Sequence, residues 1–351
     1  MAEQNYHKLE EQKNALKLRS LTEGLPPYVR DFFRGIEPTT ESRTRIAYAY
    51  DLIVFFRYLH ENNYYFSKKE VKEIKLRDLE ELRPMDIEEF LEYVKVYSSE
   101  ETGTPRANVQ STIKRKLAAL RSFYKYFYMR ELIKYNPVEL VAMPKIHEKN
   151  IIRLDSDEVK ELLDHVESGE KLTKTELAFH EKTKVRDLAI MTLLLGTGIR
   201  VSECVGLNMN DVDFKNDGIS IHRKGGKEVT VYFGDEVKEA LSDYIAERKS
   251  VIPADGHESA LFLSSQKKRM CVRSVENMVR KYTETVTLTK RITPHKLRST
   301  YGTNLYKETG DIYLVADVLG HSDVNTTKKH YAAIEDERRR QARNKVTLRK
   351  D

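Results

Sequence analysis

One stretch of the chain, residues 186–195, constrains the fold more than any other. It reads R-D-L-A-I-M-T-L-L-L and is apolar almost without interruption. A helix that is apolar on nearly every face is stable only when other elements cover it on all sides. The stretch therefore predicts a central buried helix. Gly196-Thr197-Gly198 and then Arg200 follow it, so the arginine should stand on a rigid base, as a functional side chain requires.

A polar cluster later in the chain opens with Thr293-Pro294. Proline is favoured in the first turn of a helix, where its missing N–H is not needed, so this pair predicts a helix start. His295 and Arg298 follow at a spacing of three, and residues at that spacing share one face of a helix. We therefore expect an imidazole and a guanidinium that point in the same direction.

The next motif, Leu319-Gly320-His321, follows apolar residues at helical spacing. A glycine just past such a stretch is a common C-terminal stop of a helix, so His321 should lie directly beyond a helix end. Tyr331 stands ten residues later in another short stretch that we expect to be helical.

Arginine, histidine and tyrosine make up these motifs, without a cluster of carboxylates. A planar guanidinium binds two non-bridging oxygens of a phosphate at once. Histidine donates hydrogen bonds or moves protons, and a tyrosine hydroxyl can attack phosphorus and hold the product covalently. The pattern therefore predicts phosphoryl-transfer chemistry at Arg200, His295, Arg298, His321 and Tyr331.

Four spaced motifs, taken in order, resemble a known family. They are G-T-G-I-R-V-S-E around Arg200, H-K-L-R at residues 295–298, L-G-H ending at His321, and the late Tyr331. Together they are similar to the signature of the tyrosine recombinases, the phage-integrase and Xer group. Four motifs in the family's order are far more specific than any one alone.

The resemblance implies a role for each polar residue. Arg200 and Arg298 would neutralise the scissile phosphate as negative charge builds on it. Glu203, one helical turn after Arg200, is a natural partner to orient its guanidinium. His295 and His321 would hydrogen-bond the phosphate or handle the proton of the tyrosine. No metal ion and no cofactor are implied, because the arginines replace a metal.

Tyr331 is implied as the nucleophile that forms a 3′-phosphotyrosine bond, which keeps the bond energy so that rejoining needs no ATP. It stands ten residues after His321, one more than we expect for the family. An inserted residue within 326–330 would account for the difference. Tyr331 remains the best nucleophile, since no other tyrosine lies between Tyr313 and the C-terminus.

Residues 218–233 carry the clearest strand signal. Apolar and polar residues alternate on both sides of Gly225-Gly226, which predicts a β-hairpin. Its tip, R-K-G-G-K-E, is similar to the hairpin that carries the family's catalytic lysine. Lys224, on the face opposite the core residues, is implied as the general acid that protonates the 5′-oxygen. Lys227 is the competing candidate and otherwise a DNA contact.

The first part of the chain predicts an all-helical domain. Its aromatic stripe could be a base-stacking platform, but helical spacing favours a core role for Phe55, Phe56, Phe123, Tyr124 and Phe127. Residues 104–150 hold 10 Lys/Arg and 3 Asp/Glu, which fits either a solvated basic helix or a polyanion partner. The resemblance implies a DNA-binding domain here, with contacts from Lys114, Arg115, Arg121 and Lys125.

The same periodicities and caps set the expected elements and domains. The fold class is mainly α with a small β-sheet in an α+β catalytic domain, and the resemblance implies a two-domain C-shaped clamp around DNA. We expect helices at 41–59, 85–96, 105–135, 155–166, 235–248 and 274–285. Pro105 should open the third of these helices and Asn136-Pro137 should close it, while Ser274 should cap the last. A loop or broken helix is expected at 169–183. The expected domains are a polar extension at 1–24, a helical SAM-like core-binding domain at 25–143, a linker at 144–150, and a catalytic domain with a C-terminal tail at 151–351.

Bulk features predict a cytoplasmic protein, and the resemblance implies that it is associated with the nucleoid. Cys204 and Cys271 lie far apart without metal-ligand spacing, which fits a reducing compartment. No apolar stretch approaches the ~20 residues needed to span a bilayer. The first 19 residues are polar and charged and do not resemble a signal peptide.

The predicted function is site-specific DNA recombination through a Holliday junction, by a homotetramer on two DNA sites with a dimer on each. The role could be that of a Xer-like recombinase in chromosome partition or of a mobile-element integrase. One alternative is a type IB topoisomerase, which the compact helical N-terminal domain and the L-G-H motif disfavour. A non-catalytic DNA-binding regulator is disfavoured because every polar site residue is present.

Overall fold

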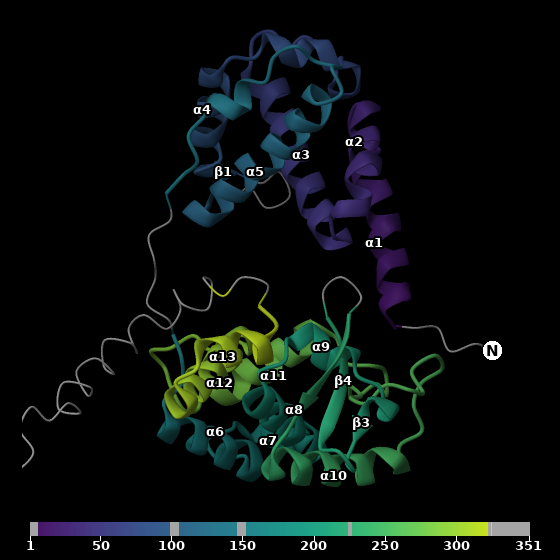
Figure 1. Cartoon of the computed structure of the whole chain (residues 1–351), viewed down its shortest axis with the longest axis vertical. Coiled ribbons are helices and arrows are strands. Elements are labelled where there is room, and N and C mark those ends of the chain that lie inside the picture. Colours follow the sequence, from purple (N-terminus) through teal and green to yellow (C-terminus); the bar gives the residue numbers. More distant parts are fainter. Residues whose placement is uncertain (1–5, 99–104, 146–151, 224–226, 322–323, 325–351) are drawn as a thin grey trace, which may run out of the picture. The chain divides into compact units, whose positions relative to one another are not determined.

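The computed structural model describes residues 6–98, 105–145, 152–223, 227–321 and 324. The chain divides into two compact units, Met1–Lys149 and Asn150–Asp351 (Figure 1). Both are mainly helical, and the second contains a three-stranded sheet. The expected fold class, mainly α with a small sheet, is confirmed. Within the described ranges no helix is both long and apolar enough to cross a membrane.

The first unit is a set of helices around one apolar core. Its helix starts follow local chemistry: Pro84 lies in the first turn of α4, and the Asp86 carboxylate accepts the backbone N–H of Arg83 over 2.7 Å. The described elements are α1 (Tyr6–Thr22), α2 (Tyr28–Ile36), η1 (Glu37–Thr39), α3 (Ser42–Asn62), η2 (Val71–Glu73), η3 (Leu76–Glu81), α4 (Pro84–Tyr93), β1 (Val96–Ser98), β2 (Pro105–Ala107), α5 (Gln110–Tyr128) and η4 (Pro137–Leu140).

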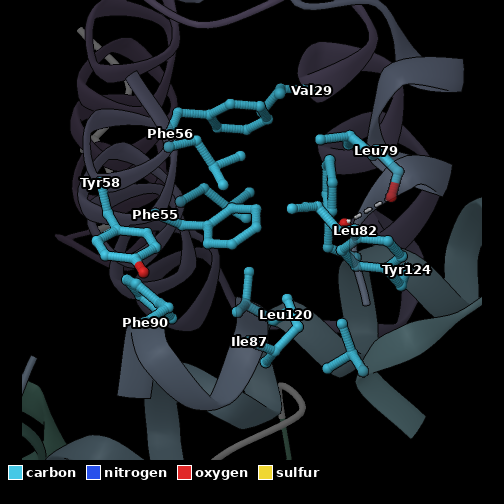
Figure 2. Packing of buried hydrophobic residues seen from close by; sticks show 14 of the residues in the cluster. Val29, Phe55, Phe56, Tyr58, Leu79, Leu82, Ile87, Phe90, Leu120 and Tyr124 are labelled. Carbon is cyan, nitrogen blue, oxygen red and sulfur yellow. Dashed lines mark hydrogen bonds between the residues drawn. The ribbon is translucent and has the colours of Figure 1, made fainter. Parts of the chain in front are cut away.

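Aromatic rings from α2, α3, α4 and α5 pack in this core, part of which is drawn in Figure 2. Phe55 packs edge-on against Phe90 with ring centroids 5.2 Å apart, and Phe123 packs in the same way against Phe127 at 5.1 Å. The buried hydroxyl of Tyr124 donates to the carbonyl oxygen of Leu79 over 3.3 Å. All five rings of the aromatic stripe are at most 1% exposed, so its prediction as core is confirmed.

The predicted start of the third helix at Pro105 is wrong. Pro105 belongs to β2, which pairs antiparallel with β1, and α5 begins only at Gln110. Asn108 holds the turn between strand and helix, because its backbone N–H donates to Lys95 and its side-chain amide donates to the Val94 carbonyl oxygen. The pairing of β1 with β2 satisfies backbone N–H and C=O groups that a longer α5 would satisfy within the helix. Helical periodicity alone does not indicate this pairing.

The predicted end of that helix at Asn136-Pro137 is also wrong, since α5 stops at Tyr128. Glu131 adopts the left-handed conformation with φ 57°, and the N–H of Leu132 then donates to the carbonyl oxygen of Phe127 over 3.1 Å. A left-handed residue just past a helix caps its last carbonyls. Glutamate is not a usual residue for that position, so the end of this helix has no recognisable stop signal.

Helix α1 packs against α3 and belongs to the first unit. Leu18 and Leu21 are partly buried against the core. The amide of Asn14 donates to the hydroxyl of Ser42 over 3.0 Å. Part of the segment expected as a polar extension thus contributes apolar contacts to this unit.

The second unit surrounds a central helix. Its described elements are α6 (Ser156–Ser168), α7 (Lys174–His180), α8 (Lys184–Thr197), α9 (Val201–Gly206), η5 (Met209–Asp211), β3 (Val212–Asp213), β4 (Gly218–His222), β5 (Glu228–Tyr232), α10 (Asp235–Ser250), α11 (Val272–Thr283), α12 (Pro294–Thr309) and α13 (Ile312–Leu319). Helix α8 contacts α6, α10 and α12, and its Ala189, Ile190, Met191, Leu193 and Leu194 are fully buried. The prediction of a central buried helix is confirmed.

The predicted hairpin is confirmed by the register of β4 and β5. Ile219 pairs with Val231 and Ile221 with Val229, and β3 adds a third antiparallel strand beside β4. Ile219 and Ile221 are buried, whereas His222 is exposed, so β4 has one face toward the core. Residues 224–226 lie outside the described residues.

Two further local predictions need correction or detail. The predicted cap of α11, Ser274, lies inside its first turn, and Cys271 occupies the N-cap position. The stretch 169–183, expected as a loop or broken helix, contains α7. Thr173 and Glu176 form a capping box there, with the N–H of Thr173 donating to the Glu176 carboxylate over 2.9 Å.

Candidate active site

Arg200 stands at the N-cap of α9, directly after a tight turn that ends α8. Gly198 makes this turn in the left-handed conformation with φ 63°. A Cβ atom on Gly198 would lie 2.4 Å from a ring carbon of Tyr301 and 3.0 Å from the Leu319 side chain. Glycine is therefore required both for the backbone angle and for the close approach of α12 and α13.

Glu203 holds Arg200 through both its backbone and its side chain. The backbone N–H of Arg200 donates to Oε2 of Glu203 over 2.7 Å, and Nη1 donates to Oε1 over 2.8 Å. Glu203 is only 6% exposed, whereas the Arg200 side chain is 38% exposed, so the carboxylate is buried while the guanidinium remains accessible. One end of the Arg200 guanidinium is thus fixed by a carboxylate.

Arg298 lies on α12, whose N-cap is Thr293 and whose first helical residue is Pro294, as predicted. Its side chain is buried, at 5% exposure. Nη1 donates to the carbonyl oxygen of Gly198 over 2.6 Å, and Nη2 donates to the carbonyl oxygen of Leu319. Backbone carbonyls orient a guanidinium without neutralising its charge.

The end of α13 is where the two arginines meet. Nη2 of Arg200 donates to the carbonyl oxygen of Gly320 over 3.2 Å, next to the Leu319 carbonyl that Arg298 uses. Gly320 has φ 61° and ends the helix, as predicted, and the N–H of His321 returns to the Ala316 carbonyl oxygen over 2.9 Å. The carbonyl end of a helix carries partial negative charge, which favours cations there.

This arrangement brings together residues that are distant in the chain. Arg200 and Arg298 are anchored on consecutive carbonyl oxygens, and half-buried His321 follows immediately. Two guanidiniums anchored at one helix end form a site that suits an anion with several oxygens, such as a phosphate.

The other predicted site residues are placed as follows. His295 is exposed in the first turn of α12, and its carbonyl oxygen accepts the Ser299 hydroxyl over 3.1 Å. Lys227 is exposed at the start of the returning strand. Lys224 and Tyr331 lie outside the described residues.

Arg223 is a site residue that sequence reasoning missed. Its guanidinium donates to the carbonyl oxygens of Asp317 and Val318, the two that precede those used by Arg298 and Arg200. The signal was present, because Arg223 continues the alternation of the buried residues Ile219 and Ile221 and so should face the core side.

The predicted DNA contacts on α5 differ in their surroundings. Arg115 donates to the carboxylate of buried Asp51, as does Lys116 over 3.1 Å. Burial raises the pKa of Asp51, although the two cations act in the opposite direction. Arg121 donates to the Val141 carbonyl oxygen over 2.6 Å. Arg115 and Arg121 therefore also have roles within the unit, while Lys125 is exposed and Lys114 half-buried.

Two family models match this chain. Residues 152–338 match the phage integrase family, and residues 29–131 match the N-terminal SAM-like domain of phage integrases. Tyrosine recombinase XerC of Caldanaerobacter subterraneus subsp. tengcongensis is 33% identical over 337 residues, which cover 92% of this chain and 87% of that protein. Tyrosine recombinase XerS of Streptococcus uberis is 32% identical over 346 residues, covering 90% and 94%.

A solved structure has the same fold. The XerH site-specific recombinase, in a post-cleavage complex with a palindromic difH substrate, matches with a TM-score of 0.64 at 18% identity, covering 95% of this chain and 93% of that one. The matching family models and relatives show that the protein is a tyrosine recombinase. The chain belongs to the phage integrase family, and its Xer-named relatives confirm the resemblance found in its motifs. It is an enzyme of site-specific DNA recombination, and the topoisomerase and regulator alternatives are not favoured.

Proposed function

We propose that Arg200 and Arg298 bind the scissile phosphate of DNA and stabilise it as negative charge develops. One observation supports this most: the two guanidiniums are anchored on the adjacent carbonyl oxygens of Leu319 and Gly320. Donors that are fixed before the reaction cost no reorganisation during it. Glu203 orients Arg200 through its two hydrogen bonds.

In the proposed reaction the hydroxyl oxygen of Tyr331 attacks the phosphorus atom. A P–O bond to tyrosine forms, the bond to the 5′-oxygen breaks, and Lys224 gives that oxygen a proton. His295 and His321 hydrogen-bond the phosphate oxygens or accept the tyrosine proton. The product is a 3′-phosphotyrosine bond and a free 5′-hydroxyl. Attack by a 5′-hydroxyl from the partner duplex reverses these steps and joins the strands without ATP.

DNA is the proposed partner of both units. Lys114, Arg115, Arg121 and Lys125 on the first unit and Lys227 on the second would contact its backbone, with charge rather than base readout as their contribution. We assign residues 25–143 to core binding and 151–351 to catalysis, joined by a linker at 144–150. Residues 1–24 precede them.

Strand exchange needs four active sites, two on each duplex, so we propose a homotetramer that passes through a Holliday junction. Relatives above 30% identity over at least 90% of this chain bear Xer names. These names support a Xer-like role over that of a mobile-element integrase. Such an enzyme would act in the cytoplasm, at the nucleoid.

Two assays test this proposal. With a nicked suicide duplex, Arg200→Ala and Arg298→Ala should bind DNA but form the covalent adduct about 10²–10³-fold more slowly. A two-site plasmid assay should give recombinant products that depend on both sites. Relaxation of supercoils without recombinants would instead favour a topoisomerase, and undiminished adduct formation by both arginine variants would refute the phosphate-binding role.

A further inference from the structure

Arg223 is the last described residue before residues 224–226, which separate β4 from β5 in the chain. Its backbone N–H donates to the carbonyl oxygen of Lys227 over 2.8 Å, so the strand pairing of β4 and β5 continues as far as this residue. Because side chains alternate along a strand, Arg223 shares the core-facing side of Ile219 and Ile221. Its position in the fold is therefore set by the sheet.

The guanidinium of Arg223 joins this sheet to α13. Nη1 donates to the carbonyl oxygen of Asp317 over 3.2 Å, and Nη2 donates to that of Val318 over 2.6 Å. With Arg298 on Leu319 and Arg200 on Gly320, four consecutive carbonyl oxygens accept hydrogen bonds from three arginines. A guanidinium presents its donors in a rigid planar fork that fits two neighbouring carbonyl oxygens, whereas a lysine ammonium is a point charge on a flexible stem.

The contact is also closely packed. A Cβ atom on Gly320 would lie 2.3 Å from Nη1 of Arg223, so only glycine leaves room for this guanidinium. Nε of Arg223 is buried and has no hydrogen-bond partner among the described residues. Among the described residues, the hydrogen bonds of this side chain are therefore its two contacts with the α13 carbonyl oxygens.

We propose that Arg223 is a positioning residue for the general acid. It ties the end of β4 to the helix end that anchors Arg200 and Arg298, and so determines where the next residue stands relative to the bound phosphate. Lys224 follows Arg223 directly, which keeps their Cα atoms ~3.8 Å apart. The proposal rests on the proposed function, in which Lys224 protonates the 5′-oxygen.

The chemistry of the leaving group gives a test that a purely structural role would not pass. In a duplex with a 5′-bridging phosphorothiolate, tyrosine attack breaks a P–S bond and the sulfur leaves as a thiolate without needing a proton. A variant that misplaces only the general acid should therefore recover on this substrate. A variant with a damaged phosphate site or fold should remain slow on both substrates.

The experiment measures single-turnover cleavage of normal and phosphorothiolate suicide duplexes by the full-length protein. Arg223→Ala should cleave the normal duplex about 10- to 100-fold more slowly, the loss expected from a misplacement on the order of 1 Å. Sulfur should restore its rate to within about threefold of the parent, as it should for Lys224→Ala. Arg273→Ala is the control: this side chain is 72% exposed and pairs with Glu276 on α11, so its loss should change neither rate.

The outcomes separate the positioning role from the lysine assignment. Rescue of Lys224→Ala without rescue of Arg223→Ala would overturn the positioning role and leave the proposed function intact. Failure to rescue Lys224→Ala would remove the lysine assignment and the positioning role with it.

Arg223→Lys is the second variant, to be used if Arg223→Ala melts well below the parent. It keeps the positive charge but lacks the planar guanidinium, so its cleavage rates on the two substrates test the same role. We expect it to be slowed less and rescued equally, and a slow rate on both substrates would contradict the proposal.

Discussion

Nη2 of Arg200 donates a hydrogen bond to the carbonyl oxygen of Gly320 over 3.2 Å, joining two residues 120 positions apart in the chain. Arg298 holds the preceding carbonyl, and Arg223 the two before it. The end of α13 thus acts as a common support for three guanidiniums. Changes to this helix end should affect catalysis even where they remove no charged group.

Gly320→Ala tests this support directly. The substitution adds strain at φ 61° and places a methyl group 2.3 Å from Nη1 of Arg223. We expect a loss of about 1–3 kcal/mol in the free energy of unfolding and a slower cleavage step, while DNA binding persists. Chemical denaturation and single-turnover cleavage measure the two effects.

Gly256→Ala is the matched control for that substitution. Gly256 has φ 77°, but a Cβ atom there would meet nothing within 4 Å. This substitution should lower the free energy of unfolding by about 1 kcal/mol through backbone strain alone, because no neighbouring atom is crowded. The cleavage rate should equal that of the parent protein. Equal effects of the two substitutions on cleavage would mean that the Arg223 contact has no catalytic importance.

Glu203→Gln should weaken the orientation of Arg200. Glutamine keeps the size of the side chain but removes the charge that accepts two hydrogen bonds at 2.7 and 2.8 Å. We expect cleavage to fall by about 10-fold or more, since charge-assisted hydrogen bonds contribute roughly 1.5–3 kcal/mol. Gel-shift affinity for the DNA site should change little. A parental cleavage rate would show that Arg200 does not need this carboxylate.

The two thiols should differ in reactivity. Burial, with a smaller effect of nearby Glu203, raises the pKa of Cys204 to about 12, whereas the Ser274 hydroxyl lowers the pKa of exposed Cys271. At pH ~8, iodoacetamide should therefore label Cys271 alone, and Ser274→Ala should slow that labelling. Mass spectrometry of the labelled protein checks this, and fast labelling of native Cys204 would contradict it.

The same raised pKa makes stability depend on pH. The unfolded chain loses the Cys204 proton above about pH 8.5, while the folded chain keeps it until about pH 12. The contribution of Cys204 is therefore fully present below about pH 8.5 and declines as the pH rises toward 12. In denaturant titrations at several pH values, Cys204→Ala should reduce the alkaline decline in the free energy of unfolding. An unchanged dependence of that free energy on pH would contradict the effect of burial on Cys204.

The basic residues of α5 should separate into two groups. Lys114→Ala and Lys125→Ala should each lower the slope of log affinity against log salt by about 1, with stability unchanged. Arg115→Ala should also cost about 1–3 kcal/mol of unfolding free energy, because it leaves the Asp51 carboxylate, 1% exposed, with one cation fewer. If all three variants behave alike in both assays, the ion pair between Arg115 and Asp51 does not contribute to the free energy of unfolding.

Much of the catalytic unit could be predicted because its signals are local. The apolar run of α8, the Thr293-Pro294 start of α12 and the glycine stop at Gly320 each depend on a few adjacent residues. The hairpin could be predicted from the alternation of apolar and polar residues on both sides of Gly225-Gly226, and the pairing of β4 with β5 confirms it.

Features that depend on distant contacts could not be predicted. The β1–β2 pairing replaces the first turn of an expected helix, and a non-glycine residue, Glu131, ends α5. The contacts of Arg223 with α13 join residues more than ninety positions apart. Every residue has a backbone carbonyl, so the sequence does not indicate which carbonyl a side chain will contact. For the same reason Arg115 was predicted as a DNA contact without its partner Asp51.

The central claim is that a phosphate held by Arg200 and Arg298 is attacked by Tyr331. Its most direct test is to trap the protein on a nicked suicide duplex, digest the adduct and map the DNA-linked peptide by mass spectrometry. The account predicts a 3′-phosphate on Tyr331, and no adduct from Tyr331→Phe although that variant still binds DNA. An adduct that persists in Tyr331→Phe, or one that maps to Tyr313, would contradict it.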